Sequence, residues 1–172
     1  MTSSPTCPRR CGHHTWTVEP ISYDAPQTQE LLLRLHDEQT QLYGFADHPA
    51  DNPAHHFAPP HGLFLIAHDR TTGPVACGGW RLVVPQTAEI KGMYVAPAAR
   101  GQTLGRTVLR HLETDAQLRD VTRIQLERGA ANLVALALYR SHGYTPVPSY
   151  RTGRDPRINR AFSKPLTPSG SD

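Results

Sequence analysis

The segment from Arg100 to Arg106 has the residue types that bind a negatively charged group. It reads Arg-Gly-Gln-Thr-Leu-Gly-Arg and lies between a strand-like run and an amphipathic run with helical spacing. The first N–H groups of a helix lack intrahelical partners and carry the positive end of the helix dipole, so they bind phosphate where Gly permits close approach. The two arginines add positive charge. The same glycines would also suit a plain, tight strand-to-helix connection.

Two common phosphate-binding motifs do not match this turn. No Gly-Lys-Ser/Thr follows, as a P-loop requires, and the spacing and parallel βαβ setting of the dinucleotide fingerprint are missing. A second motif runs from Asn132 to Tyr139 and is followed by Gly143-Tyr144. Together with Val95-Ala96-Pro97 and the turn, it resembles the GNAT superfamily of acyl-CoA N-acyltransferases. The resemblance spans roughly Leu63 to Leu166.

This resemblance implies a site for acetyl-CoA as the acyl donor. In the superfamily, acyl-CoA lies where two neighbouring strands separate, which here implies an opening between Met93 to Val95 and Thr122 to Glu127. Backbone groups of Tyr94 and Val95 would contact the pantetheine arm and the thioester, and a backbone N–H would polarise the carbonyl. Asn132 would bond pantetheine, cap its helix, or do both. The implied cofactor-binding residues are Met93, Tyr94, Val95, Arg100, Gly101, Gln102, Thr103, Leu104, Gly105, Arg106 and Asn132.

Thr103 departs from the family pattern, which usually has Gly at this position. Its β-branched side chain would crowd a pyrophosphate or oppose a positive φ, although its backbone N–H can still donate. Gly101 and Gly105 keep the rest of the pattern. We expect Thr103 to affect cofactor affinity more than the fold.

Direct acyl transfer to an amine needs a base for the amine proton and an acid for the departing thiolate. The resemblance implies Tyr139 as the acid, and the alternative is a buried aromatic residue bonded to backbone. Glu89 is the first candidate for the base because it lies on a strand out of phase with the core residue Ile90. A solvated Glu89 is equally compatible with the sequence, and Glu127 or a water chain could take its place. Cys77 has no evident base, so a covalent acyl-enzyme is not expected.

The acceptor pocket is expected from the first helix, the loop after it and the last strand connection. Acidic groups there would hold a cationic amine, whereas arginines would bind a carboxylate or phosphate; either set could also be a solvated surface. We expect a small primary amine, an amino acid derivative or an antibiotic-like metabolite as acceptor rather than a protein tail. The candidate residues are Asp37, Glu38, Tyr43, Asp47, Tyr150, Arg151, Arg154 and Arg157.

Hydrophobic periodicity predicts the elements that position these residues. Helices are expected from an N-cap at Asp24 to Gly44, over Gly105 to Leu118, and from Asn132 to Gly143, the last being apolar almost all round and hence largely buried. Phe45 to Gly62 is expected to be a long loop or a short irregular helix. Strands are expected at Thr15 to Ser22, Leu63 to His68, Pro74 to Val84, Thr87 to Val95, Thr122 to Glu127, Tyr144 to Val147 and Asn159 to Lys164.

One of these strands carries an extra residue. Ala88 and Ile90 lie at even positions, whereas Met93 and Val95 lie at odd ones, with Gly92 at the change. A β-bulge around Lys91 to Met93 would return both pairs to the core face and would separate the strand from its neighbour. The order of elements predicts the α+β class with a central, mixed and largely antiparallel sheet flanked by helices.

Composition limits the remaining possibilities. The 172 residues, 38% hydrophobic and 19% charged, suit one globular domain, expected at 15–166 between an N-terminal tail at 1–14 and a frayed end at 167–172. No apolar run approaches the length of a membrane span and no secretory signal is evident, so the cytoplasm is the expected location. The net charge of +3 gives little support for nucleic-acid binding through Arg151 to Arg160.

Three further possibilities stay open in the sequence. Cys7, Cys11, His13 and His14 have metal-binding side chains, but their spacing is weak and no metal site is predicted. A non-catalytic acyl-CoA-binding sensor or partner protein is the main alternative to an enzyme, and Thr103 is its best support. A homodimer is suggested only by the resemblance, because exposed strand edges in this architecture often pair between subunits.

Overall fold

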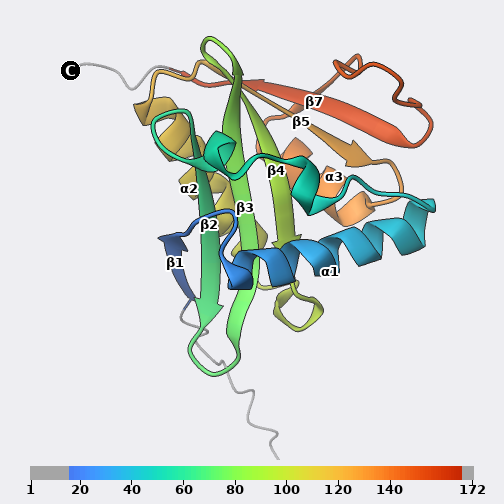
Figure 1. The fold of residues 1–172 in the computed structure, drawn as a ribbon. Helices are drawn as coiled ribbons and strands as arrows, with labels where there is room; N and C mark the ends of the chain where they lie inside the picture. The colour runs from blue at the N-terminus through green and yellow to red at the C-terminus, as the bar shows by residue number, and fades with distance from the viewer. Residues whose placement is uncertain (1–15, 168–172) are drawn as a thin grey trace, which may run out of the picture.

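The sheet has seven strands in the order β1-β2-β3-β4-β5-β7-β6. The computed structural model describes residues 16–167, so the predicted tail at 1–14 and most of the predicted C-terminal end lie outside the described residues. All neighbouring strands pair antiparallel except β4 and β5, which are parallel, and this confirms the predicted α+β class. The elements are β1 Trp16–Pro20, α1 Pro26–Tyr43, η1 Pro49–Asp51, η2 Ala54–Phe57, β2 Gly62–Asp69, β3 Gly73–Val84, β4 Thr87–Val95, η3 Pro97–Ala99, α2 Leu104–Leu118, β5 Arg123–Gly129, α3 Leu133–Ser141, β6 Thr145–Val147 and β7 Asn159–Pro165 (Figure 1).

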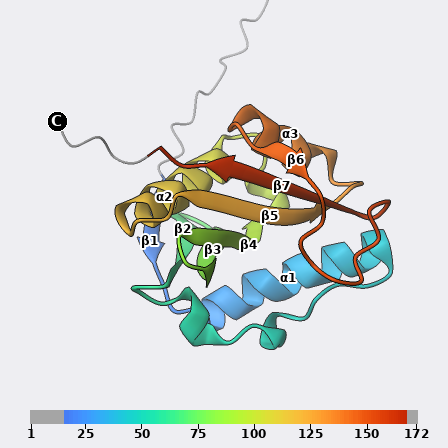
Figure 2. The same cartoon turned by 90° about the horizontal axis from the view of Figure 1, so that it is seen from above.

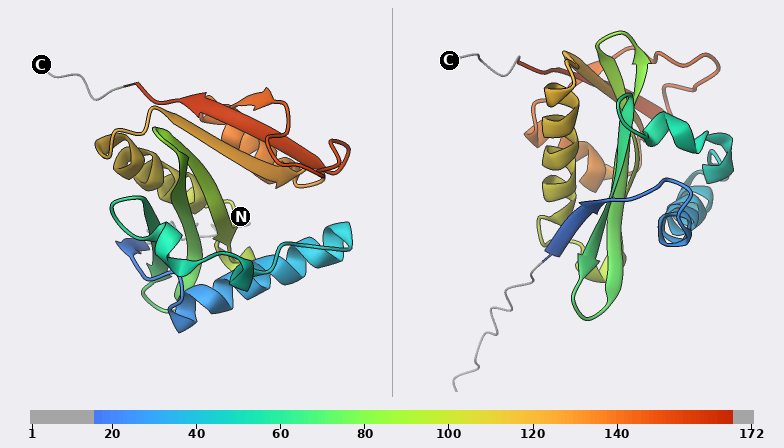
Figure 3. Two further views of the ribbon diagram at one scale, coloured as in Figure 1. Left: turned by 45° about the horizontal axis from the view of Figure 1, so that its top comes forward. Right: turned by 60° about the vertical axis from the view of Figure 1, so that its left-hand side comes forward.

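Helices cover both faces of this sheet. α1 and the segment with η1 and η2 lie on one face, and α2 lies on the other (Figure 3), with α3 on the same side as α2 (Figure 2). The buried stripe of α1 is Leu31, Leu32 and Leu35, at the helical spacing that directs one face to the core. α2 buries an equivalent stripe that includes Val108, Leu109 and Leu112. These two helices fix the position of β3 and β4 between them.

Two details of the helices differ from the sequence prediction. The N-cap of α1 is Ala25 rather than Asp24, and no side chain caps this helix. Asp24 instead accepts a hydrogen bond from the Ser22 hydroxyl. α3 is not largely buried: Leu133 and Val134 are 72% and 80% exposed. The sheet covers one side of a nine-residue helix only, so an apolar composition all round leaves the outer side exposed.

β4 contains the predicted bulge. Cys77 pairs with Tyr94 and Gly79 with Lys91, so three steps along β4 match two steps along β3. Gly92 takes a φ of 66°, which glycine adopts without the steric cost that other residues incur. Alternation resumes beyond it, and both Ile90 and Met93 are buried.

The bulge coincides with the point where β4 and β5 separate. Their pairing covers Thr87–Glu89 against Arg123–Gln125 and ends there. The open edges are therefore Ile90–Val95 of β4 and Leu126–Gly129 of β5. The opening exists as predicted, but the prediction began it too early on β5, because Arg123, Ile124 and Gln125 are paired.

Candidate active site

The turn before α2 presents a row of backbone donors. Gly101 has a φ of 76° and Thr103 a φ of 65°, so Thr103 adopts the left-handed conformation that the missing glycine would have taken. In residues 16–167, none of the N–H groups from Gly101 to Arg106 donates a hydrogen bond to another residue. A methyl group added at Gly105 would meet only the side chains of Val95 and Leu138, at 3.5 and 3.6 Å. The protein therefore leaves these donors unpaired and the space beside Gly105 uncrowded.

Arg100 contacts other parts of the protein rather than the mouth of this turn. Its Nε donates to the Val95 carbonyl at 2.8 Å, and its Nη2 lies 2.8 Å from both carboxylate oxygens of Glu38 on α1. Its guanidinium also lies over the Tyr94 ring. Arg100 thus links α1 to the end of β4. Arg106, the other arginine of the turn, is also exposed.

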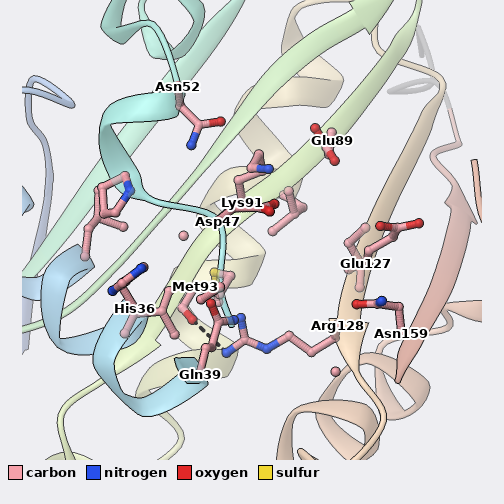
Figure 4. Close-up of a pocket in the computed structure, with 18 of the residues that line it drawn as sticks. His36, Gln39, Asp47, Asn52, Glu89, Lys91, Met93, Glu127, Arg128 and Asn159 are labelled. Atoms are coloured by element: carbon pink, nitrogen blue, oxygen red, sulfur yellow. Dashed lines mark hydrogen bonds between the residues drawn. The ribbon is translucent and has the colours of Figure 1, made fainter. Parts of the chain in front are cut away.

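A cavity of about 140 Å³ opens beneath the bulge. α1, the loop after it, β4, β5 and the 148–158 segment all contribute to its wall (Figure 4). Met93 lines it from the open edge of β4, Tyr139 from α3, and Glu89 from the part of β4 that pairs with β5. The wall has an apolar part from Leu32, Leu35 and Phe45 and a polar part formed mostly by charged side chains.

Glu89 is buried, with 3% of its surface exposed, so it is not a solvated strand residue. Its Oε2 accepts hydrogen bonds from Nε and Nη2 of Arg81 at 3.0 and 2.9 Å. Its Oε1 accepts one from the Tyr150 hydroxyl and lies 3.1 Å from Nη2 of Arg151. Two guanidinium groups and a phenol therefore fix the position of this carboxylate at the cavity wall.

Tyr139 is buried, and its ring packs edge-on against Tyr144. Its hydroxyl makes no hydrogen bond to another described residue, so the alternative of a phenol bonded to backbone does not apply in residues 16–167. Burial raises the pKa of Tyr139, and the charge of Arg128 opposes that rise. A neutral phenol at the cavity wall can donate a proton or a hydrogen bond. Asn132 caps α3, because its side chain accepts from the Ala135 N–H at 3.0 Å.

The predicted acceptor residues divide into two groups. One group lines the cavity and consists of Tyr43, Asp47, Arg151 and Arg154. Tyr150 does not line the cavity, but its hydroxyl donates to Glu89. Burial opposes ionisation of Asp47, but the hydrogen bond and charge of Arg154, with Lys91 and Arg151, hold the pKa of Asp47 below its usual value. The others do not line the cavity: Asp37 is exposed, Glu38 binds Arg100, and Arg157 pairs with Asp155.

Cys77 plays no nucleophilic part in this arrangement. It is fully buried, burial raises the pKa of its thiol, and its Sγ donates to the Gly92 carbonyl at 3.4 Å. The residue lies on β3, where it pairs with Tyr94 beside the bulge. Cys77 therefore acts as a small buried hydrophobe.

Comparison with known proteins identifies this architecture. The model of the acetyltransferase (GNAT) family matches residues 29–144, which include the bulge, the turn and α3. The chain belongs to the GNAT acetyltransferase family. Enzymes of this family generally use an acyl-CoA donor.

Individual GNAT relatives cover most of the chain. A protein named IAA acetyltransferase from Azospirillum brasilense is 34% identical over 154 residues, which are 85% of this chain and 97% of the relative. A solved structure assigned as an acyl-CoA N-acyltransferase, from Klebsiella pneumoniae, is 26% identical with a TM-score of 0.75 and covers 88% of this chain and 98% of its own. The ribosomal-protein-S18-alanine N-acetyltransferase of Escherichia coli shares the fold, with a TM-score of 0.64, 20% identity and coverage of 92% and 98%.

Three cationic residues of this GNAT site were missed by sequence reasoning. Lys91 lines the cavity two residues after Glu89, and Arg128 lines it from the open part of β5. Arg81 reaches Glu89 from β3. The signal for Lys91 was available, since residues two apart on a strand share a face until a bulge intervenes. The other two depend on strand pairing, which the sequence does not display.

Two absences apply to residues 16–167 only. No helix there is long and apolar enough to cross a membrane. No group of three or more His, Cys, Asp or Glu side chains is placed there to hold a metal ion. Cys7, Cys11, His13 and His14 lie outside the described residues.

Proposed function

We propose that this GNAT enzyme transfers an acetyl group from acetyl-CoA to the primary amine of a small molecule. The observation that carries the proposal is the cavity beneath the bulge, which joins the open edge of β4 to a buried, charged wall. The turn at Gly101 to Arg106 would bind the pyrophosphate through its unpaired N–H groups. A cavity of about 140 Å³ favours a small acceptor over a folded protein surface.

The proposed reaction is direct. The neutral amine nitrogen attacks the thioester carbonyl carbon, the C–S bond breaks, and the amine proton goes to Glu89 directly or through one water. Tyr139 donates its phenolic proton to the departing thiolate and regains one from solvent. Burial keeps Tyr139 protonated, as this role requires.

Glu127 is retained as the rival base. Its Oε1 accepts from the Ser149 hydroxyl, but its Oε2 is buried and accepts no hydrogen bond from the described residues. Glu89, in contrast, has both oxygens engaged. Kinetics of Glu89 and Glu127 variants must therefore decide which residue is the base.

The testing experiment is titration calorimetry with acetyl-CoA and desulfo-CoA on the wild type, Gly105→Asp and Gly105→Ala. Both variants add a Cβ where there is room, but only aspartate places an anion at the helix N-terminus. We expect about tenfold or greater loss of affinity in Gly105→Asp and less than threefold in Gly105→Ala.

Thiol release from acetyl-CoA in an amine screen is the second part of this experiment. Turnover with a small primary amine supports the proposed function. No binding at millimolar acetyl-CoA would overturn it, and binding without turnover on any amine would favour the non-catalytic alternative.

A further inference from the structure

The carboxylates of the cavity wall are already matched by arginines. Glu89 is bound by Arg81 and Arg151, as described above. Asp47 accepts from Nη1 of Arg151 at 3.1 Å and from Nη2 of Arg154 at 2.6 Å. Nε of Arg154 also lies 3.5 Å from Oε2 of Glu127. Three acidic side chains and three arginines thus form one network, and these arginines are not free for a ligand.

Two further cations line the same cavity outside this network. Neither Lys91 nor Arg128 forms an ion pair with a carboxylate within residues 16–167. Lys91 extends from β4 into the cavity (Figure 4). Arg128 donates from Nη2 to the Met93 carbonyl at 3.2 Å, while its Nε is buried and has no hydrogen-bond partner. A buried guanidinium N–H without a partner is costly, and an anion would satisfy it.

We propose that Lys91 and Arg128 form the subsite for a carboxylate of the acceptor. This rests on the proposed function, because it places the carboxylate in the same cavity as the reacting amine. Ammonium and guanidinium groups that face one cavity without a direct ion pair to a carboxylate attract an anionic ligand, and burial strengthens that attraction. An acceptor with a second cationic group would instead face two positive charges that no carboxylate pairs directly.

The position of Arg128 also specifies where the carboxylate lies relative to the amine. Its hydrogen bond to Met93 places the guanidinium at the bulge, on the open edge of β4 where the thioester is proposed to lie. A carboxylate bound there leaves only a short distance to the reacting nitrogen. The acceptor class is therefore an α- or β-amino acid, or a derivative that keeps the free carboxylate and the amine.

The test compares alanine, leucine, phenylalanine and β-alanine with their carboxamides, and with aminoalkylphosphonates, as acceptors of acetyl-CoA. The amides keep the amine and side chain but lack the charge. We expect kcat/KM for at least one free acid to exceed that of its amide by about tenfold or more. In Lys91→Gln and in Arg128→Gln that preference should fall about tenfold, whereas in Arg157→Gln it should not change. Arg157 is a matched control because its side chain is 88% exposed and pairs within its own loop.

Calorimetry with the N-acetyl derivatives of the same amino acids gives a readout that does not require turnover. We expect wild type and Arg157→Gln to bind them and both cavity variants to bind about tenfold more weakly. Transfer to amides as fast as to acids, or binding that neither cavity variant weakens, would overturn the carboxylate subsite while the acetyltransferase proposal stands. A preference for the phosphonates over the carboxylates would overturn the carboxylate assignment. Binding of N-acetyl amino acids without transfer to any amine would support the subsite and refute the proposed reaction.

Discussion

Arg128 on β5 donates a hydrogen bond to the carbonyl of Met93 on β4, at 3.2 Å, across the gap where the two strands have separated. Backbone pairing between β4 and β5 has ended here, and the charged side chain of Arg128 makes the hydrogen bond between the strands instead. The thioester is proposed to lie at the same place. One side-chain hydrogen bond therefore connects the two edges, and their other backbone groups stay unpaired with each other. Arg128 is both a structural link and the nearest charge to the bulge carbonyl.

The first prediction separates these two roles of Arg128. The Met93 carbonyl lies on an open edge and can accept from water, so Arg128→Gln should lower the free energy of unfolding by only about 1 kcal/mol. Urea unfolding at equilibrium measures this. A loss of several kcal/mol would show that the variant's weaker acceptor binding reflects damage to the fold, and a second variant, Arg128→Lys, would then be needed to retain the charge.

The second prediction concerns the base. If Glu89 takes the amine proton, Glu89→Gln should lower kcat by about 100-fold or more. The affinity for desulfo-CoA should change less than threefold, because Glu89 is remote from the phosphate turn. Glu127→Gln is the matched comparison, and a larger loss of kcat there would assign the base to Glu127.

Glu89→Gln should also destabilise the protein, since it leaves Arg81 without its carboxylate partner and Arg151 with Asp47 alone. Breaking a buried ion pair costs about 3 to 5 kcal/mol, although glutamine keeps one acceptor for the two guanidinium groups. Kinetics must therefore be compared at a temperature where calorimetry shows the variant folded. A kcat within a few-fold of wild type under that condition would exclude Glu89 as the base.

The third prediction uses the isolation of the Tyr139 hydroxyl. Tyr139→Phe keeps the buried ring and removes a group that bonds no described residue, so unfolding free energy should change by less than about 1 kcal/mol. If Tyr139 protonates the thiolate, kcat should fall about 10- to 100-fold. Because burial raises the pKa of Tyr139, its ionisation adds no alkaline limb near neutral pH. An unchanged kcat would contradict the assignment.

Sequence periodicity predicted the bounds of β4 and the bulge within it, because an extra residue changes which positions are apolar. The turn before α2 was predictable from two glycines and two arginines before an amphipathic run, and its phosphate binding stays a prediction. α3 was predicted wrongly, since Leu133 and Val134 look like core residues until the sheet is seen to cover only one side of the helix.

The ion-pair network could not be predicted from sequence in this way. Arg154 binds Asp47, which is 107 residues earlier, and Arg151 joins Asp47 to Glu89. Nothing local marks such partners, because any of the chain's arginines and carboxylates would look alike on the surface. These pairs form because the strand order places the 148–158 segment beside the cavity, next to Asp47 and Glu89.

The fourth prediction concerns Thr103, which holds a left-handed conformation that costs a β-branched residue about 1 to 2 kcal/mol. Thr103→Gly should relieve about 1 kcal/mol of this strain and raise Tm by about 2 to 4 °C. Thr103→Val, which keeps the β-branch, should give no gain. Calorimetric melting of the three proteins decides this, and a lower Tm in Thr103→Gly would show that the turn is not strained.

The fifth prediction follows from the titration of Lys91. Burial lowers the pKa of Lys91 to about 8; Glu89 and Asp47 oppose this effect, and Arg151 and Arg81 add to it. The ammonium form therefore predominates below about pH 8, and the neutral amine predominates above it. Affinity for an N-acetyl amino acid should fall as pH rises through about 8, because the carboxylate loses one of its two cations.

The lowered pKa of Lys91 also makes the stability of the fold depend on pH, but stability rises with pH whereas the affinity for the carboxylate falls. Between about pH 8 and the ordinary lysine pKa of 10.5, the unfolded chain binds this proton and the folded one does not, so the contribution of Lys91 to stability rises with pH. Calorimetric Kd values from pH 6.5 to 9.5 check the binding side, and the probe has no amine of its own to titrate. Lys91→Arg keeps its charge throughout and should flatten the profile. A profile that still falls near pH 8 in this variant would assign the titration to another group.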